Sequence, residues 1–262
     1  MRFASLGSGS EGNGLLVEVG ATRVLIDCGF GVRDTVARLA RIGVAPETVT
    51  AIIVTHEHSD HICGVAPFAA RFGTPVWLTF GTLEAVAERF AALPHVYGFD
   101  SHDVFEVGEI EVRPFPVPHD AREPVQFVCS DGCWRLGVLT DLGISTAYVE
   151  ASLSGCDALV LECNHDLDML KVGPYPWLVK QRVLSRTGHL SNHAVSEYLS
   201  DPDGFDAIAR YLVLAHVSQE NNNPDLVRLS AEEALKRRPT ESAFTGELLV
   251  ASQHVPLKPL EL

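Results

Sequence analysis

The chain has 262 residues, of which 46% are hydrophobic and 21% charged, a composition typical of a globular protein with ample material for a core. Its net charge of −14 argues against broad, sequence-independent binding of nucleic acid through lysine and arginine, although bound divalent metals could supply positive charge for a phosphate substrate. No apolar run approaches the roughly 18–20 residues of a spanning helix, and the start MRFASLGSGSEGNG lacks the features of a signal peptide. We therefore expect a cytoplasmic protein without membrane association.

Strands and helices are predicted to alternate along the chain, with no low-complexity tract or long polar linker between them. The first predicted elements are two short strands around a turn at Gly20, Ala21 and Thr22. A helix, a buried strand, a second helix and another strand follow, and their ranges are Asp34–Ile42, 51–55, Gly64–Phe72 and Val76–Thr79. This alternation predicts the α/β class.

Two later segments resemble two earlier ones. RLGVLTDLG, from Arg135, resembles RVLIDCG, from Arg23, and DALVLECNHD, from Asp157, resembles TAIIVTHEHSD, from Thr50. Such short repeats also arise by chance. If the repeat reflects a duplication, it implies two similar β/α halves.

Four apolar, strand-like runs each end in a residue that could bind a metal. The runs are AIIV, LGVLT, ALVLEC and YLVLA, and the residues that follow them are the histidines after Thr55, then Asp141, His165 and His216. In layered α/β folds, functional sites form beyond the carboxyl ends of the strands. Four such endings therefore indicate that these residues converge on one cavity.

The stretch THEHSDH contains three histidines and an aspartate within six residues, directly after a buried strand. Neutral imidazole and carboxylate are natural ligands for zinc, manganese and iron. His56 and His58 are two residues apart and share one side of an extended segment, whereas Asp60 and His61 follow in a predicted turn and can face a different centre. This spacing suits two neighbouring metals. The alternative, a set of surface histidines at a strand end, fits the pattern less well.

Together these motifs resemble the metallo-β-lactamase-fold hydrolase superfamily, and in particular its WalJ/YycJ-like subfamily. The resemblance is carried, in order along nearly the whole chain, by SLGSGSEGN, LIDCG, THEHSDH, FPVPHDAREPVQFV, VLTDLG, LECNHD, GHLSN and LAHVSQENN. It implies an α/β fold built as a four-layer αββα sandwich, with a single domain of this type over residues 1–262.

The resemblance also implies the ligands of two divalent metal ions, zinc or manganese or else iron. His56, His58 and His119 would hold the first ion, Asp60, His61 and His216 the second, and Asp141 would bridge both. Taken without the resemblance, His119 has no decisive context, Asp141 could be a helix N-cap and His216 a buried core histidine.

Further residues are expected to surround these ligands. The resemblance places His189, in GHLSN, beside the leaving group as a non-ligand catalytic residue, and Asp60 is assigned to catalysis as well as to the metal. Asp27 is expected to orient the cluster loop. His165 is expected near the site without binding metal. The glycine-rich loop places Ser8 and Asn13 at the site, unless it is only a flexible turn; it lacks the G-K-[ST] ending of a P-loop.

One segment is unusually basic for so acidic a chain. No Asp or Glu occurs between Met169 and Ser196, where four cations are interspersed with Tyr175 and Trp177. Such a segment can hold a phosphate backbone and stack a base, so Lys180 and Arg182 are candidate substrate contacts. The alternative is a solvated helix face around Leu178 to Leu184.

These expectations favour a metal-dependent hydrolase that cleaves phosphodiester bonds, and most specifically a 5′-directed DNA exonuclease with nucleic acid as its partner. A metal-bridged hydroxide would attack the phosphorus in line while His189 assists the leaving group. Three alternatives stay open, since one fold hosts many activities: a phosphodiesterase acting on small cyclic phosphates, a carbonyl-directed thioesterase or lactonase, and a metal-binding accessory protein of cell-wall signalling. The sequence leaves the oligomeric state open.

Overall fold

The computed structural model describes residues 1–262, and the chain divides into two compact units. Unit 1 comprises Met1–Pro116, Ala121–Cys133 and Ser252–Leu262; unit 2 comprises Val117–Asp120 and Trp134–Ala251. None of the helices has the length and apolar character needed to cross a lipid bilayer.

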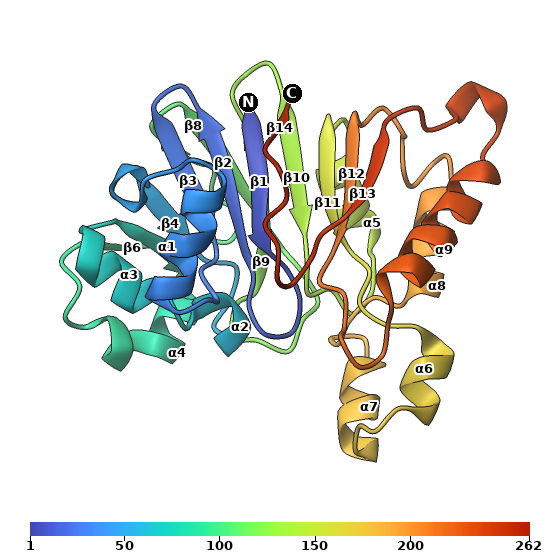
Figure 1. The fold of residues 1–262 in the computed structure, drawn as a ribbon, viewed down its shortest axis with the longest axis horizontal. Coiled ribbons are helices and arrows are strands. Elements are labelled where there is room, and N and C mark those ends of the chain that lie inside the picture. The colour runs from blue at the N-terminus through green and yellow to red at the C-terminus, as the bar shows by residue number, and fades with distance from the viewer. The chain divides into compact units, whose positions relative to one another are not determined.

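Unit 1 contains a seven-stranded sheet in the order β14-β1-β2-β3-β4-β5-β6 (Figure 1). Its strands are β1 (Arg2–Gly7), β2 (Gly14–Val19), β3 (Thr22–Ile26), β4 (Ala51–Ile53), β5 (Val76–Thr79), β6 (Val96–Phe99) and β14 (Leu260–Glu261). From β3 to β6 the neighbouring strands are parallel, so their carboxyl ends lie at one edge. Three further strands, β7 (Phe105–Val107), β8 (Ile110–Pro116) and β9 (Val125–Ser130), pair antiparallel in sequence order.

The helices of unit 1 connect the parallel strands. They are α1 (Val32–Arg41), η1 (Pro46–Thr48), α2 (Ser59–Ile62), α3 (Val65–Phe72) and α4 (Phe80–Phe90). Their apolar faces pack on the sheet in a core that includes Leu25, Leu39, Ile52 and Phe68, each fully buried. The predicted helices Asp34–Ile42 and Gly64–Phe72 correspond to α1 and α3 with small shifts at their ends, and the strand Val76–Thr79 coincides with β5.

Unit 2 has four strands that pair parallel in the order β10-β11-β12-β13. Their bounds are β10 (Arg135–Leu139), β11 (Ala158–Glu162), β12 (Tyr211–Ala215) and β13 (Glu247–Val250). The connecting helices are α5 (Ala147–Leu153), α6 (Leu167–Val172), α7 (Trp177–Val183), α8 (Asn192–Ser200), α9 (Pro224–Lys236) and η2 (Thr240–Ser242). Side-chain caps begin several of them; Ser191 Oγ, for example, accepts the N–H of Ala194 at the start of α8.

The two earlier segments and the two later segments that resemble them occupy corresponding strands, one pair in each unit. β3 and β4 are adjacent parallel strands, as are β10 and β11. Asp27, just after β3, and Asp141, just after β10, both have left-handed backbone conformations, with φ of 60° and 54°. His216, directly after β12, shares this conformation with φ of 53°. Such angles are uncommon outside glycine and concentrate at functional sites.

Candidate metal-binding site

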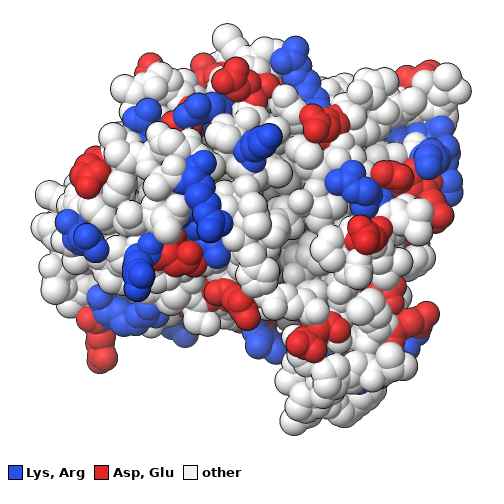
Figure 2. Space-filling model, in the orientation of Figure 1, with Lys and Arg blue, Asp and Glu red and all other residues white.

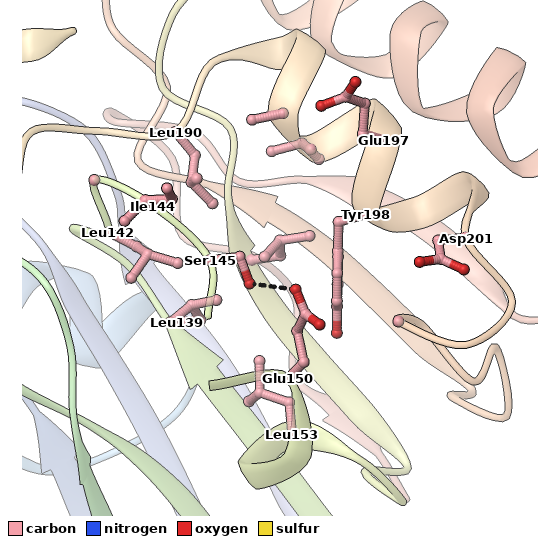
Figure 3. Close-up of a pocket in the computed structure, with 15 residues that line it drawn as sticks. Leu139, Leu142, Ile144, Ser145, Glu150, Leu153, Leu190, Glu197, Tyr198 and Asp201 are labelled. Carbon is pink, nitrogen blue, oxygen red and sulfur yellow. Dashed lines mark hydrogen bonds between the residues drawn. The ribbon is translucent and has the colours of Figure 1, made fainter. Parts of the chain in front are cut away.

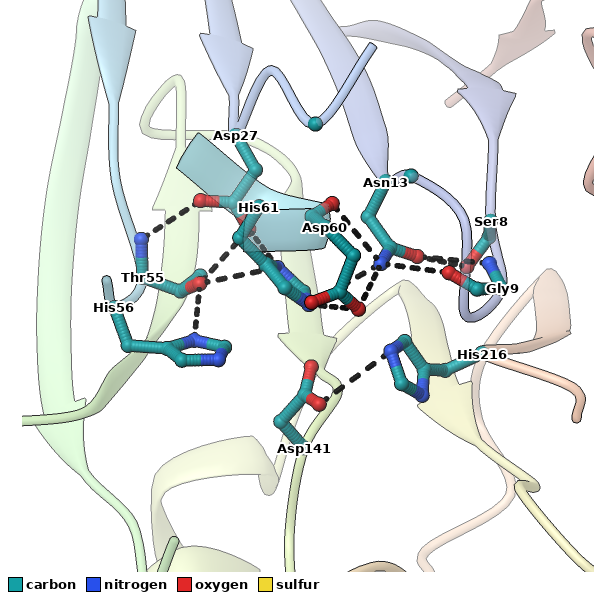
Figure 4. Close-up of polar contacts among 12 residues, drawn as sticks. Ser8, Gly9, Asn13, Asp27, Thr55, His56, Asp60, His61, Asp141 and His216 are labelled. Atoms are coloured by element: carbon teal, nitrogen blue, oxygen red, sulfur yellow. Dashed lines mark hydrogen bonds and ion pairs between the residues drawn. The ribbon is translucent and has the colours of Figure 1, made fainter. Parts of the chain in front are cut away.

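The histidine cluster of unit 1 lies immediately beyond β4, where the chain turns into α2. The ring centroids of His56 and His58 are 4.6 Å apart, and those of His56 and His61 are 4.3 Å apart. Oδ2 of Asp60 lies 3.4 Å from Nε2 of His61. His56 and His61 are almost completely buried, whereas His58 and Asp60 are partly accessible. The four residues that the sequence predicted as ligands within THEHSDH are therefore close together in unit 1. Figure 4 shows three of them, His56, Asp60 and His61.

Asp27 fixes the orientation of this cluster. Its Oδ1 accepts the N–H of Thr55 at 2.8 Å, and its Oδ2 accepts the Thr55 hydroxyl and contacts Nδ1 of His61, both at 2.8 Å. Because a carboxylate only accepts, Nδ1 of His61 is the protonated nitrogen, and Nε2 carries the lone pair that a metal needs. The Thr55 oxygen can then accept Nδ1–H of His56 at 2.9 Å, which gives His56 the same tautomer. Asp27 thus makes the contacts expected of a residue that orients metal ligands.

The glycine-rich loop between β1 and β2 lies against the same cluster. Asn13 Oδ1 accepts hydrogen bonds from the Ser8 hydroxyl and the Gly9 N–H, both at 2.9 Å. Its side-chain nitrogen lies 3.1 Å from Nε2 of His61, and its backbone N–H donates to the Asp60 carbonyl at 2.8 Å. Ser8 and Asn13 are both buried, so these two predicted residues lie in the cluster's immediate surroundings.

A second cluster lies in unit 2, at the carboxyl ends of its parallel strands. Oδ1 of Asp141 is 3.4 Å from Nε2 of His216 and 3.8 Å from Nε2 of His119. Nδ1 of His189 is 3.6 Å from the same oxygen. His119, Asp141 and His216 are all buried, and His189 is partly accessible. The three ligands predicted in unit 2 are therefore together, with the predicted catalytic histidine beside them.

Glu162, the last residue of β11, is a member of this cluster that the sequence interpretation missed. It is fully buried, its Oε1 lies 2.7 Å from Nδ1 of His189, and its Oε2 accepts the backbone N–H groups of Leu142 and Leu190. The signal was present in ALVLEC, where a charged residue ends an apolar strand. The sequence instead favoured His165, three residues later, as the residue near the site.

The close contacts of Glu162 and His189 change the proton affinity of both groups. Burial opposes ionisation of Glu162, yet the charge and hydrogen bond of His189 outweigh it and lower the pKa of Glu162 to about 2. Burial alone would lower the pKa of His189, but the Glu162 carboxylate raises it above the usual value for histidine, with a smaller contribution from Asp141. The pair therefore favours a protonated His189.

Three other predicted residues occupy different surroundings. His165 is 1% exposed, neither of its ring nitrogens has a hydrogen-bond partner, and burial lowers its pKa to about 4. Its neighbour Asn164 is the residue that contacts His216, since its Nδ2 lies 3.1 Å from Nδ1 of that histidine. Lys180 donates to the carbonyl of Lys171 at 2.7 Å, and the Arg182 guanidinium pairs with the carboxylate of Asp120, the residue after His119.

A separate cavity of about 320 Å³ lies within unit 2, between the strands and helices α5 and α8 (Figure 3). Its wall is largely aliphatic, and inside it the Ser145 hydroxyl donates to Glu150 at 2.8 Å. None of the predicted metal ligands lines this cavity, although Leu142 and Leu190, which adjoin Asp141 and His189, do so.

The donor set in both units fits divalent transition metals. Imidazole nitrogen and carboxylate oxygen suit zinc, manganese or iron, and the hydrogen bonds of Asp27 and Thr55 prepare the imidazoles of His56 and His61 for binding. Within unit 2, Asp141, Glu162, His189 and His216 offer ligand atoms within 4.8 Å of one another. The clusters therefore have the chemistry of metal centres.

Comparisons with known proteins agree with this chemistry. Residues 22–217 match the model of the β-lactamase superfamily domain, so the chain belongs to this family. The crystal structure of the metallo-β-lactamase fold protein YhfI from Bacillus subtilis superposes with a TM-score of 0.75 at 19% identity, covering 98% of this chain and 99% of that one. The predicted fold, an α/β sandwich of metallo-β-lactamase type, is confirmed, and the chain is a metal-dependent hydrolase.

Two curated relatives define the chain's place in the family more narrowly. Exodeoxyribonuclease YycJ of Bacillus anthracis is 34% identical over 240 residues, which cover 91% of this chain and 90% of the relative. Exodeoxyribonuclease WalJ of Streptococcus pneumoniae serotype 2 is 34% identical over 244 residues, covering 87% and 86%. The predicted resemblance to the WalJ/YycJ-like subfamily is thereby confirmed.

Proposed function

We propose that this protein is a metal-dependent exodeoxyribonuclease that hydrolyses phosphodiester bonds from the 5′ end of DNA. Two relatives named as exodeoxyribonucleases, each 34% identical over most of the chain, support a nucleic-acid substrate. The observation that carries the proposal is the contact between His189 and buried Glu162, which favours a protonated imidazole 3.6 Å from Asp141, a predicted metal ligand.

In this proposal seven side chains hold two divalent ions, zinc or manganese. His56, His58 and His119 would bind one ion, Asp60, His61 and His216 the other, and Asp141 both. When bound, the ions would supply Lewis acidity, which lowers the pKa of water towards neutrality and neutralises charge on the phosphate. Asp27 and Thr55 would keep His61 and His56 in the tautomer that presents Nε2.

His189 would protonate the oxygen that leaves the phosphorus. Glu162 holds Nδ1–H, so the other ring nitrogen, Nε2, is the one that can deliver a proton. The raised pKa of His189 keeps a larger fraction of the imidazole protonated at neutral pH than in a free histidine. A phosphodiester needs such a donor because its alkoxide leaving group is strongly basic. Hydrolysis of a carbonyl compound such as a thioester, whose thiolate leaves readily, has less use for it.

The test is a comparison of substrates on protein purified without added metal, whose metal content is measured by elemental analysis. We expect release of nucleotides from 5′-phosphorylated or 5′-hydroxyl DNA duplexes, together with hydrolysis of bis-p-nitrophenyl phosphate. Nitrocefin, a thioester and a lactone are offered in parallel. Dominant turnover of any of these three, or bound metal with no turnover of any phosphodiester, would reject the proposal. A small cyclic phosphodiester, included in the series, separates a nuclease from a small-molecule phosphodiesterase.

A further inference from the structure

Helix α7 is an apolar helix that its own unit leaves uncovered. None of its residues is buried, and Trp177 and Leu178 at its start are 68% and 77% exposed. Leu184, directly after the helix, is 48% exposed. Large apolar side chains exposed together in this way indicate a surface that meets a partner. The tip of the α6–α7 region also displays mostly uncharged atoms in the view of Figure 2.

The charges on and around α7 identify the kind of partner. Lys180 contacts only a backbone carbonyl, and Arg186 is exposed and forms no ion pair, so no carboxylate neutralises either charge. No acidic residue occurs between Met169 and Ser196, in a chain with 34 acidic and 20 basic residues. Cations beside an exposed aromatic ring are the combination that binds a nucleic acid strand, because the cations contact its phosphates and the ring stacks on its bases.

The end of α7 packs against and hydrogen-bonds with the loops that carry the predicted site residues of unit 2. The N–H of His189 donates to the Val183 carbonyl at 3.0 Å, and Nδ1 of His119 lies 3.1 Å from the Gly188 carbonyl. A Cβ added to Gly143, two residues after Asp141, would lie 2.3 Å from the backbone of Arg186. Trp177 precedes Val183 by six residues, or about 9 Å along the helix, which corresponds to roughly three nucleotides of a stacked strand.

We propose that α7 is a stacking platform for single-stranded DNA, on which Trp177 and Leu178 contact the bases while Lys180 and Arg186 contact the phosphates. This inference rests on the proposed function, because it names the surface that would guide a strand past His189. It assigns Trp177 to binding and not to the chemical step. A strand without bases should therefore lose the contribution of Trp177.

The test measures binding without turnover. The native protein and the variants Trp177→Ala, Trp177→Phe and Leu229→Ala are titrated into a fluorescein-labelled dodecamer of thymidine with phosphorothioate linkages, followed by anisotropy. We expect Trp177→Ala to weaken binding about tenfold, since one stacked base contributes about 1–3 kcal/mol. Trp177→Phe should retain most of the affinity. Leu229 is 51% exposed on α9, and its substitution should change the affinity less than about twofold.

A dodecamer of abasic sites provides the second arm of the experiment. The native protein and Trp177→Ala should bind it equally, because no base is present to stack. Equal affinity of the two proteins for the thymidine strand, or the same loss on the abasic strand, would overturn the proposal. So would a dimer of the native protein, seen by light scattering, that Trp177→Ala converts to a monomer. If binding depends on Trp177 and the bases but no DNA is hydrolysed, the proposed function fails and the platform stands.

Discussion

Glu162 and His189 form a buried carboxylate–imidazole pair, with Oε1 of Glu162 2.7 Å from Nδ1 of His189. The second carboxylate oxygen accepts two backbone N–H groups, from Leu142 and Leu190, so the glutamate is fixed from both sides. These neighbours follow Asp141 and His189 directly in the sequence. One side chain therefore contacts two loops that carry residues predicted to be functional.

Replacement of His189 by alanine should lower the rate of nucleotide release from DNA by about 10²- to 10⁴-fold, because a general acid contributes on that order when an alkoxide leaves. The metal content, determined by elemental analysis, should stay unchanged. His193, an exposed histidine on α8 that pairs with Glu197, is the matched control, and His193→Ala should behave as the native protein. Loss of metal from the His189 variant would instead make His189 a ligand.

Substitution of Glu162 separates its charge from its hydrogen bonds. Glu162→Ala leaves the N–H groups of Leu142 and Leu190 without an acceptor, at about 1–3 kcal/mol each, so urea unfolding should show a loss of several kcal/mol. Glu162→Gln can still accept both backbone N–H groups through its one amide oxygen and should be less destabilised, while its amide N–H₂ then faces Nδ1 of His189. Without the negative charge, the pKa of His189 falls, and turnover should decline at a lower pH on the alkaline side than in the native protein. An unchanged alkaline limb in the glutamine variant would contradict this role.

Asp27→Asn should weaken metal binding without a large effect on the fold. Asparagine tolerates the left-handed backbone of this position, and its oxygen can still accept the N–H of Thr55, but its amide N–H₂ would then face both Nδ1–H of His61 and the Thr55 hydroxyl. Avoidance of that donor–donor contact moves the His61 proton to Nε2. We expect a 10- to 100-fold lower affinity, measured by competition with a chromophoric chelator. The same measurement on Asp103→Asn, at an exposed aspartate, should give the native affinity.

A methyl group at Gly29 should displace the backbone next to the histidine cluster of unit 1. A Cβ built there would lie 1.7 Å from the carbonyl oxygen of Asp60 and 2.8 Å from the N–H of Asn13, and backbone atoms cannot move aside cheaply. Gly29→Ala should therefore lower the metal content of the purified protein. Gly31, two residues later, has open space around its Cβ position, and Gly31→Ala should bind metal normally. Equal metal content in both variants would show that the Asp60 loop is more pliable than these contacts indicate.

His165 should make the protein less stable in mild acid. Its folded-state pKa of about 4 lies below the ordinary value of 6.5, so the unfolded chain takes up a proton in a pH range where the folded chain does not. Above pH 6.5 His165 is neutral in both the folded and the unfolded chain, and its titration costs no stability. As the pH falls from 6.5 towards 4, only the unfolded chain binds the proton, and stability is lost. Between pH 7.5 and 5.5 the free energy of unfolding should fall by about 1 kcal/mol more in the native protein than in His165→Leu. Urea unfolding of both proteins with a chelator present measures the difference; parallel pH profiles would refute it.

Much of this organisation was predictable because the parallel strands are short, apolar and followed at once by polar residues. Because functional groups lie beyond the ends of such strands, the sequence alone predicted that the THEHSDH residues, Asp141 and His216 belong to a site. It did not distinguish His165 from its neighbours, since alternate residues after a strand face opposite sides, and Glu162 and Asn164 make the contacts with His189 and His216. The ion pair between Arg182 and Asp120 could not be foreseen either, because it joins helix α7 to a loop residue 62 positions earlier in the chain.

The left-handed backbone at Asp27, Asp141 and His216 bears on attempts to improve this protein in the laboratory. Glycine relieves such a conformation at no steric cost. At Asp27 and His216 this gain is opposed by the loss of buried contacts, so we expect a stabilising glycine only at Asp141, where it would remove a predicted metal ligand. Selection for heat resistance alone would therefore favour inert variants. A library enriched in this way needs a parallel screen for retained metal.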